Sequence, residues 1–247
     1  MNSGARGWKT RFLLALVSAG WCSIAFGYRP FEGTDAAVAE AGELELELGP
    51  LQSLREGSER TLIAPQAVIN YGLAKNWEAV WESEIAHDRS ESRRTRLIGN
   101  GAFLKGVLRD GGLQDRPGPS VATEFGLLLP GVNDDHGTGA SVAGIVSYRW
   151  PLATVHLNAV GSVTREHNRD VFIGTIVEGP QEWRVRPVAE VFHEYETDTA
   201  HTTSVLVGAI WRARDRLAVD FGLREANTTD HRVRELRAGL TYSWPER

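Results

Sequence analysis

Apolar and polar residues alternate along most of the chain after residue 41. The alternation begins with Glu43-Leu44-Glu45-Leu46-Glu47-Leu48, and the last segment places Leu236, Leu240 and Trp244 on one face. A period of two is the pattern of a β-strand, whose successive side chains point to opposite faces. The pattern predicts twelve strands, at 42–49, 62–73, 77–85, 100–109, 120–129, 139–150, 152–165, 170–178, 182–194, 202–212, 216–224 and 233–244.

The connections between these strands fall into two groups. Links from even to odd strands are mostly tight, whereas links from odd to even strands are longer and polar. An even strand count with this inequality is typical of an outer-membrane barrel. Over residues 42–247 we therefore predict an all-β fold, an antiparallel transmembrane β-barrel of about 12 strands with short periplasmic turns and longer extracellular loops. The long links are 50–61, 86–99, 130–138, 166–169, 195–201 and 225–232, and the 110–119 link is long at the other end.

The position of the aromatic residues separates this barrel from a soluble one. A soluble sandwich or lipocalin-like barrel shows the same alternation with its apolar face inside, but has no reason to gather tryptophans at one end. Amphipathic rings are stable at the membrane interface. The predicted membrane-interface girdle, next to the short turns or the C-terminus, is Tyr71, Trp77, Tyr148, Trp150, Trp183, Trp211, Tyr242 and Trp244.

The polar face of the predicted strands carries ionisable residues of both signs. An isolated charge facing lipid costs about 2–4 kcal/mol at mid-bilayer, so this face is assigned to the lumen. The like charges of Glu43, Glu45 and Glu47 need partners, and Arg237 is the expected one if the last strand pairs with the first. The candidate lumen-lining residues are Glu43, Glu45, Glu47, Glu82, Lys105, Glu124, Arg149, Arg184, Arg186, Glu190, Asp220 and Arg237.

Residues 1–27 have the composition of a secretory signal peptide. Three basic residues precede the short apolar run at 12–17, and the stretch ends in the small-x-small site Ala25-Phe26-Gly27. Cleavage before Tyr28 removes Cys22, the one cysteine, so the mature chain has no disulfide, thiolate metal site or cysteine nucleophile. We predict export to the outer membrane of a Gram-negative cell.

The start of the mature chain carries a recognisable motif. Arg29-Pro30-Phe31-Glu32-Gly33-Thr34-Asp35-Ala36-Ala37-Val38 precedes Gly42-Glu43-Leu44-Glu45-Leu46, and the hairpin at 71–78 follows. This stretch resembles the outer-membrane transporter family named for the meta-pathway of phenol degradation, although Ala36 stands where a second Asp is common. The resemblance implies a barrel that passes aromatic or other hydrophobic compounds. Residues 28–41 form a candidate plug through Arg29, Pro30, Phe31 and Asp35.

Catalytic and metal chemistry find little support in the sequence. Barrel lipases and deacylases need a Ser two residues after a His on one strand, and none of the seven histidines has one. His156, Asn158 and Ser162 share a face and are interpreted as hydrogen-bonding groups of the lumen. Asp134-Asp135-His136 suits a divalent cation, a pair of protease-like acids or a solvated loop, and the loop is favoured. No catalytic residue, metal or cofactor is therefore predicted.

The balance of charge limits the partners. The net charge is −5 and Lys and Arg form no block, so a nucleic-acid partner is not expected. The expected partners are outer-membrane lipid and a small-molecule solute, and the sequence predicts no oligomeric state. Three functions stay open: a channel for small, aromatic or hydrophobic solutes through a charged lumen, a closed structural or partner-binding barrel, and an outer-membrane hydrolase.

Overall fold

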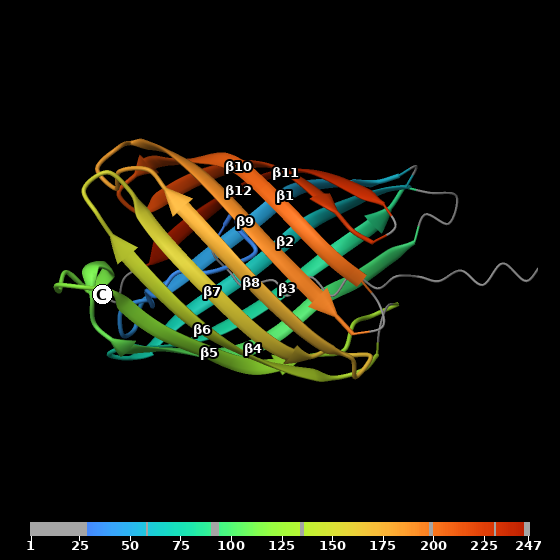
Figure 1. The fold of residues 1–247 in the computed structure, drawn as a ribbon, viewed down its shortest axis with the longest axis horizontal. Helices are drawn as coiled ribbons and strands as arrows, with labels where there is room; N and C mark the ends of the chain where they lie inside the picture. Colours follow the sequence, from blue (N-terminus) through green and yellow to red (C-terminus); the bar gives the residue numbers. More distant parts are fainter. Residues whose placement is uncertain are drawn as a thin grey trace, which may run out of the picture.

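The computed structural model describes residues 29–57, 59–89, 94–133, 136–197, 200–229 and 231–244 (Figure 1). The predicted signal peptide, with Cys22, lies outside these residues, as do Asp134 and Asp135 of the candidate cation site.

Twelve antiparallel strands and one turn of 3-10 helix, η1 (Gly112–Gln114), make up the described secondary structure. No helix in the described ranges is long and apolar enough to cross a membrane. The strands are β1 (Leu44–Glu56), β2 (Glu59–Ala74), β3 (Trp77–Asp88), β4 (Thr95–Arg109), β5 (Ser120–Leu128), β6 (Gly139–Arg149), β7 (Thr154–Val163), β8 (Arg169–Glu178), β9 (Val185–Glu196), β10 (Ala200–Arg214), β11 (Leu217–Asn227) and β12 (Arg232–Trp244).

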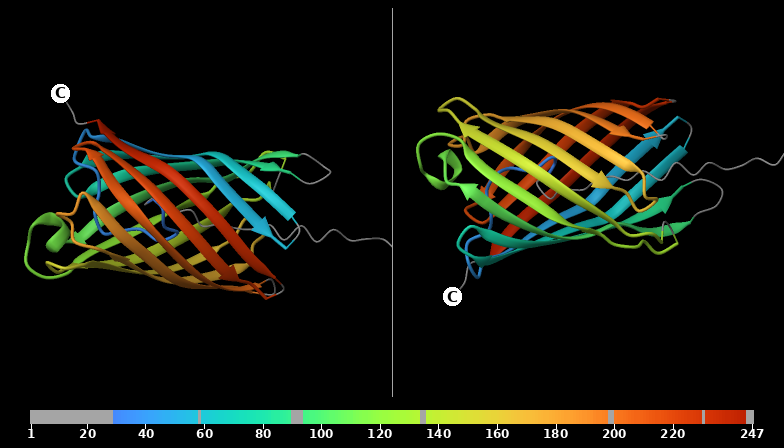
Figure 2. Two further views of the ribbon diagram at one scale, coloured as in Figure 1. Left: turned by 90° about the horizontal axis from the view of Figure 1, so that it is seen from above. Right: turned by 60° about the horizontal axis from the view of Figure 1, so that its bottom comes forward.

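The strands form one closed barrel, as Figures 1 and 2 show. Each strand pairs with its neighbours in sequence, and β1 pairs with β12 from Leu44↔Trp244 to Glu56↔Val233. Closure leaves no sheet edge with unpaired backbone groups. The predicted twelve-stranded antiparallel barrel is confirmed.

The lengths of the connections differ most from the prediction at two places. β1 and β2 continue through the predicted 50–61 link, so that only residues 57 and 58 join them, and the predicted 86–99 link shrinks to 89–94. Register shifts between Leu48 and Leu51 and between Ile63 and Gln66 accommodate the prolines that interrupt the alternation. Strand pairing thus continues past the alternating segments, and the two ends have connections of more similar length than predicted.

The two faces of the barrel have opposite polarity. Apolar side chains such as Leu108, Leu127 and Ile173 point outward and are 57–63% exposed. Inward positions carry the buried charged and polar residues, among them Glu82, Lys105 and Glu190. A soluble barrel would have the reverse arrangement, whereas an apolar outer band around a polar interior is that of a transmembrane barrel.

The eight predicted girdle aromatics lie at one end of the barrel, which we call the terminal end because β1 begins and β12 ends there. Trp244 and Tyr71 both flank Leu44 in the ladder. Tyr148 packs on Trp150 with ring centroids 4.2 Å apart, and Tyr242 packs on Trp244 at 4.3 Å. The other end of the barrel is called the distal end.

Candidate functional site in the barrel lumen

Residues 29–43, which precede β1, run inside the ring of strands (Figure 2). We call this stretch the inner segment. Phe31 packs in a buried apolar cluster with Ile176, Val188, Leu206 and Ile210. Ala36 packs in a second cluster that contains Phe172 and Phe192. The inner segment therefore has apolar as well as polar contacts with the wall.

Side chains of the wall accept hydrogen bonds from the backbone of the inner segment. A buried stretch without regular secondary structure needs such acceptors, because unsatisfied buried amides are costly. Acidic side chains of β1, β3 and β9 provide most of them. The bonds are Arg29 N to Glu47 at 3.0 Å, Glu32 N and Gly33 N to Glu190 at 2.9 and 2.7 Å, Thr34 N to Asn158 at 3.0 Å, Ala36 N to Ser147 at 2.9 Å, and Ala39 N to Glu78 at 2.7 Å.

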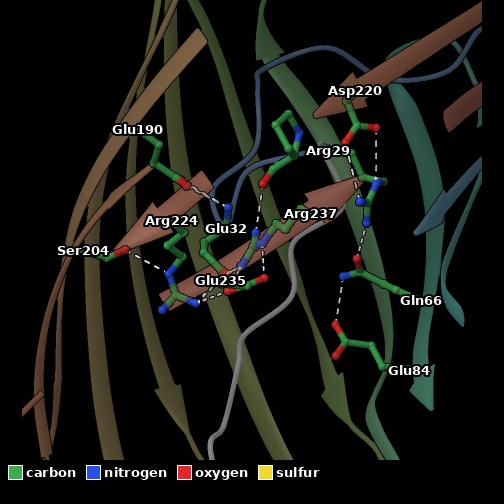
Figure 3. A network of polar contacts seen from close by, with 11 residues as sticks. Arg29, Glu32, Gln66, Glu84, Glu190, Ser204, Asp220, Arg224, Glu235 and Arg237 are labelled. Atoms are coloured by element: carbon green, nitrogen blue, oxygen red, sulfur yellow. Dashed lines mark hydrogen bonds and ion pairs between the residues drawn. The ribbon is translucent and has the colours of Figure 1, made fainter. Parts of the chain in front are cut away.

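Arg29 anchors the beginning of the inner segment to three strands (Figure 3). Its Nε lies 3.3 Å from Oδ2 of Asp220 on β11. A guanidinium nitrogen also donates to Gln66 on β2, whose amide donates to Glu84 at 2.8 Å. The guanidinium lies against Gly239 of β12, where a Cβ atom would overlap it. A side chain at this position would displace the guanidinium of Arg29 from its present place.

Glu32 joins a second buried network, drawn in Figure 3. Its carboxylate lies 3.5 Å from Arg224 NH1 and also accepts a hydrogen bond from Arg237. Both arginines pair with Glu235 on β12, with Arg224 NH1 at 2.7 Å from Glu235 Oε2. Arg224 also donates to Ser204 Oγ at 2.9 Å. Two arginines are thereby balanced by two carboxylates, one of which belongs to the inner segment.

Lys105 on β4 holds the middle of the inner segment. Its Nζ donates to Thr34 Oγ1 at 3.1 Å and lies 3.4 Å from Asp35 and 3.5 Å from Glu78. Burial by itself raises the pKa of the Asp35 carboxyl, but the positive charge of Lys105 contributes to a net shift below the usual value of 3.8. Asp35 is therefore held in its charged form.

A serine, a histidine and a glutamate form a hydrogen-bonded chain across three neighbouring strands. Ser147 Oγ lies 2.7 Å from His156 Nδ1, and His156 Nε2 lies 2.9 Å from Glu178 Oε1. Arg186 lies 3.2 Å from the other oxygen of Glu178. The residue types are those of a hydrolytic triad, but Ser147 is fully buried and accepts the N–H of Ala36. A nucleophile must be open to its substrate, so this chain positions the inner segment.

The structure places most of the predicted lumen residues inside the barrel. Glu43 and Glu45 are half-buried near the start of β1, and Arg149 and Arg186 are half-buried near the terminal end of β6 and β9. Arg184 does not line the lumen: β9 begins only at Val185, and Arg184 lies exposed on the preceding connection. The fully buried members of the predicted set are Glu47, Glu82, Lys105, Glu124, Glu190, Asp220 and Arg237.

The expected pairing of Arg237 with the acidic residues of the first strand is wrong. Arg237 faces Gln52 in the β1–β12 ladder, well beyond Glu47 along β1. It bonds Glu235, Glu32 and the carbonyl oxygen of Pro30 at 2.8 Å, whereas Glu47 accepts the N–H of Arg29. Strand pairing was predicted correctly, but the register decides which side chains meet.

Several residues of the site are absent from the predicted lumen-lining set. Glu32, Arg224 and Glu235 belong to one network, and Ser147 meets His156 directly across the β6–β7 ladder. For Arg224, Glu235 and Ser147, the signal available in the sequence was the alternation that places them on the inward face of their strands. Among the described residues, no group of three or more His, Cys, Asp and Glu side chains is arranged to hold a metal ion.

Comparison with known proteins adds information on the fold. No family model and no curated protein matches the sequence. The crystal structure of the COG4313 outer membrane channel from Pseudomonas putida F1 is similar, with a TM-score of 0.60, 10% identity, and coverage of 85% of this chain and 97% of that one. The KdgM porin in complex with disordered oligogalacturonate has a TM-score of 0.55 and 11% identity, with coverage of 81% and 99%. The chain thus has the fold of outer-membrane barrels.

Proposed function

We propose that this protein is an outer-membrane channel for small solutes, with its terminal end toward the periplasm. The observation that carries the proposal is the inverted polarity of a closed barrel, apolar outside and lined by charges of both signs inside. An aqueous or solute-binding lumen gives such charges a role. The likeness of the fold to an outer-membrane channel and a porin supports the same assignment.

The inner segment sets the state of this channel. It takes up the charged groups that a solute would otherwise meet, because Glu32 binds Arg224 and Arg237 and because Glu190 accepts two amides. We assign the described arrangement to a closed or narrow state. Residues 28–41 accordingly act as a plug that opens or moves when a solute passes.

The environment of Arg224 suggests the class of solute. Its guanidinium carbon lies 5.3 Å from the ring centroid of Phe192, and the Phe172 ring lies 5.0 Å from that ring. A cation beside two aromatic rings suits a small compound with both a ring and an acidic group. The resemblance of the mature N-terminus to the family named for phenol degradation supports aromatic solutes independently.

Conductance in a planar bilayer tests the proposal. The chain from residue 28 onward would be compared with a variant lacking residues 28–41, both refolded and checked for heat-modifiable migration on gels. Discrete current steps in the shortened variant, with smaller or rarer steps in the parent, are expected. Benzoate added to one side should then block the current or carry it. Absence of steps in both folded proteins would overturn the proposal.

A closed structural barrel is the second candidate. The specific observation that favours it is the buried network itself, in which arginines and carboxylates from β11, β12 and the inner segment satisfy one another. Such a barrel would insert stably and pass no current with or without residues 28–41. The same recordings therefore distinguish the two candidates.

A further inference from the structure

Arginines form a row on the outer face of the barrel near its distal end. Arg55 on β1 lies directly opposite Arg60 on β2 and opposite Arg234 on β12. All three are exposed, on the face opposite to inward-pointing residues such as Gln52 and Val233. Arg89 extends the row, because its N–H donates to the carbonyl oxygen of Arg60 at 2.9 Å. Four neighbouring strand ends thus present arginines side by side.

This arrangement is unfavourable for the protein alone. Like charges directly opposite one another on adjacent strands destabilise a sheet. Glu225 on β11 lies opposite Arg234 of β12, and its carboxylate is 3.8 Å from Arg234 and 3.2 Å from Arg232. The carboxylate of Glu225 therefore pairs with two arginines, Arg232 and Arg234, and both arginine side chains are more than half exposed. The outer face retains an excess of positive charge that an external anion would neutralise.

The row lies at the depth of lipid headgroups. Arg234 is ten residues from Trp244 of the aromatic girdle along β12. With a rise of about 3.3 Å per residue and a tilt of roughly 40°, this separation corresponds to about 25 Å along the barrel axis. An apolar band of about 25 Å separates the two interfaces of such barrels. When the girdle lies at one interface, Arg234 lies at the other.

An apolar groove begins beside the row and extends toward the middle of the membrane face. Its volume is about 500 Å³, and Val205, Val207, Leu223 and Leu236 line it together with Ser53. Arg234 and Glu225 lie at its distal end. An apolar groove with cations at one end has the polarity expected for an acyl chain joined to an anionic headgroup.

We propose that this surface binds a phosphorylated lipid of the outer leaflet, with the phosphate on Arg55, Arg60 and Arg234 and an acyl chain in the groove. Guanidinium groups bind phosphate through paired, charge-assisted hydrogen bonds, which explains arginine at each position. The lipid neutralises a row that is otherwise repulsive. The site lies on the outer face of the barrel wall, although the lining of the groove also includes Arg224 and Glu235 of the lumen network. It does not depend on conduction, but its place in the outer leaflet rests on the orientation proposed above for the channel.

Native mass spectrometry of the refolded protein tests the site. The probe is lipid A, a phosphorylated glycolipid, offered in detergent micelles with its dephosphorylated form as a second arm. The row variant carries Arg55→Gln, Arg60→Gln and Arg234→Gln. The matched control carries Arg116→Gln, Arg214→Gln and Arg216→Gln, which removes three exposed arginines at the terminal end.

One phosphorylated lipid should remain bound to the parent and to the control, with at least a tenfold loss in the row variant. Equal retention by the row variant would overturn the proposal, as would equal retention of the dephosphorylated lipid. Inorganic phosphate at the same concentration should not displace the lipid, and displacement would indicate an anion site without a lipid. Leu223→Trp, which fills the groove, should reduce retention while leaving the arginines in place. Unchanged lipid retention in Leu223→Trp would overturn the part of the proposal that places an acyl chain in the groove.

Discussion

Arg29 and Asp220 form a buried ion pair at 3.3 Å although they are 191 residues apart in the sequence. Their side chains are 4% and 3% exposed. Arg29 begins the inner segment, and Asp220 belongs to β11, the strand before the last. The pair therefore joins the first described residue to the strands that complete the barrel.

Breaking this pair from one side should lower stability markedly. Asp220→Asn leaves the charge of Arg29 buried without its carboxylate, and removal of one partner of a buried pair costs about 3–5 kcal/mol. We expect a loss of that order in the free energy of unfolding, measured by urea titration of tryptophan fluorescence in lipid vesicles. The double variant with Arg29→Gln should lose less than the sum of the single variants. Strictly additive losses in the two single variants would contradict the contact between Arg29 and Asp220. As a control, Glu225→Gln at an exposed ion pair should lower the free energy of unfolding by less than about 1 kcal/mol.

Neutralising Glu32 should make the lumen more attractive to anions. Glu32→Gln leaves Arg224 and Arg237 with Glu235 as their remaining acidic partner in the network. We expect the reversal potential in a KCl gradient to shift toward anion selectivity, with a rise in conductance as the inner segment loosens. Glu225→Gln removes a charge on the outer face and should leave selectivity unchanged. An identical reversal potential in Glu32→Gln and the parent would argue against the charge balance described above.

A methyl group at Gly72 should displace the inner segment where it enters β1. A Cβ atom there would overlap the carbonyl oxygen of Glu40, and Gly42 N donates to Gly72 O at 2.8 Å. With Ala36→Cys as a buried reporter, maleimide labelling should rise at least tenfold in Gly72→Ala.

The matched control is Gly144→Ala, because a Cβ atom at Gly144 meets nothing within 4 Å. Labelling in this control should equal that of the reporter variant alone. Equal labelling in the Gly72 and Gly144 variants would show that the segment does not depend on close approach at Gly72.

Ser147 should not react as a catalytic nucleophile. Its hydroxyl is buried beneath Ala36, so a fluorophosphonate probe should leave the intact protein unlabelled, and short-chain esters should not be hydrolysed. Ser147→Ala should instead weaken docking of the inner segment by about 1–3 kcal/mol, the cost of an unsatisfied buried donor. Urea titration of this variant measures the loss. Stoichiometric labelling of the parent, absent in Ser147→Ala, would favour the hydrolase function.

The barrel could be predicted from the sequence because a strand period of two is visible in one dimension. The same pattern assigns inward residues such as Glu190 and Asp220 to the polar face without any knowledge of their partners. Partners depend on register, which the alternation does not contain: the β1–β12 ladder sets Arg237 opposite Gln52 and far from Glu47. The meeting of Ser147 with His156 across two strands was missed for the same reason.

Contacts of the inner segment were still less accessible to sequence reasoning. Glu32 lies in an irregular stretch, where no periodicity indicates which side chain turns toward the wall. Its partners come from β9, β11 and β12, more than 150 residues later in the chain. Arg184 was assigned to the lumen because the predicted strand begins at residue 182, whereas β9 begins at Val185.

The threading of the inner segment through the ring has a consequence for the order of assembly. Arg29 and Glu32 find their ionic partners on β11 and β12, which are synthesised last, and β12 is also the strand that closes on β1. A chain that ends before β12 lacks both the seam and Arg237, which donates to Glu32 and to the carbonyl oxygen of Pro30. Arg29 and Glu32 therefore reach their full set of ionic contacts only when β11 and β12 are in place, so that docking of the inner segment follows barrel closure.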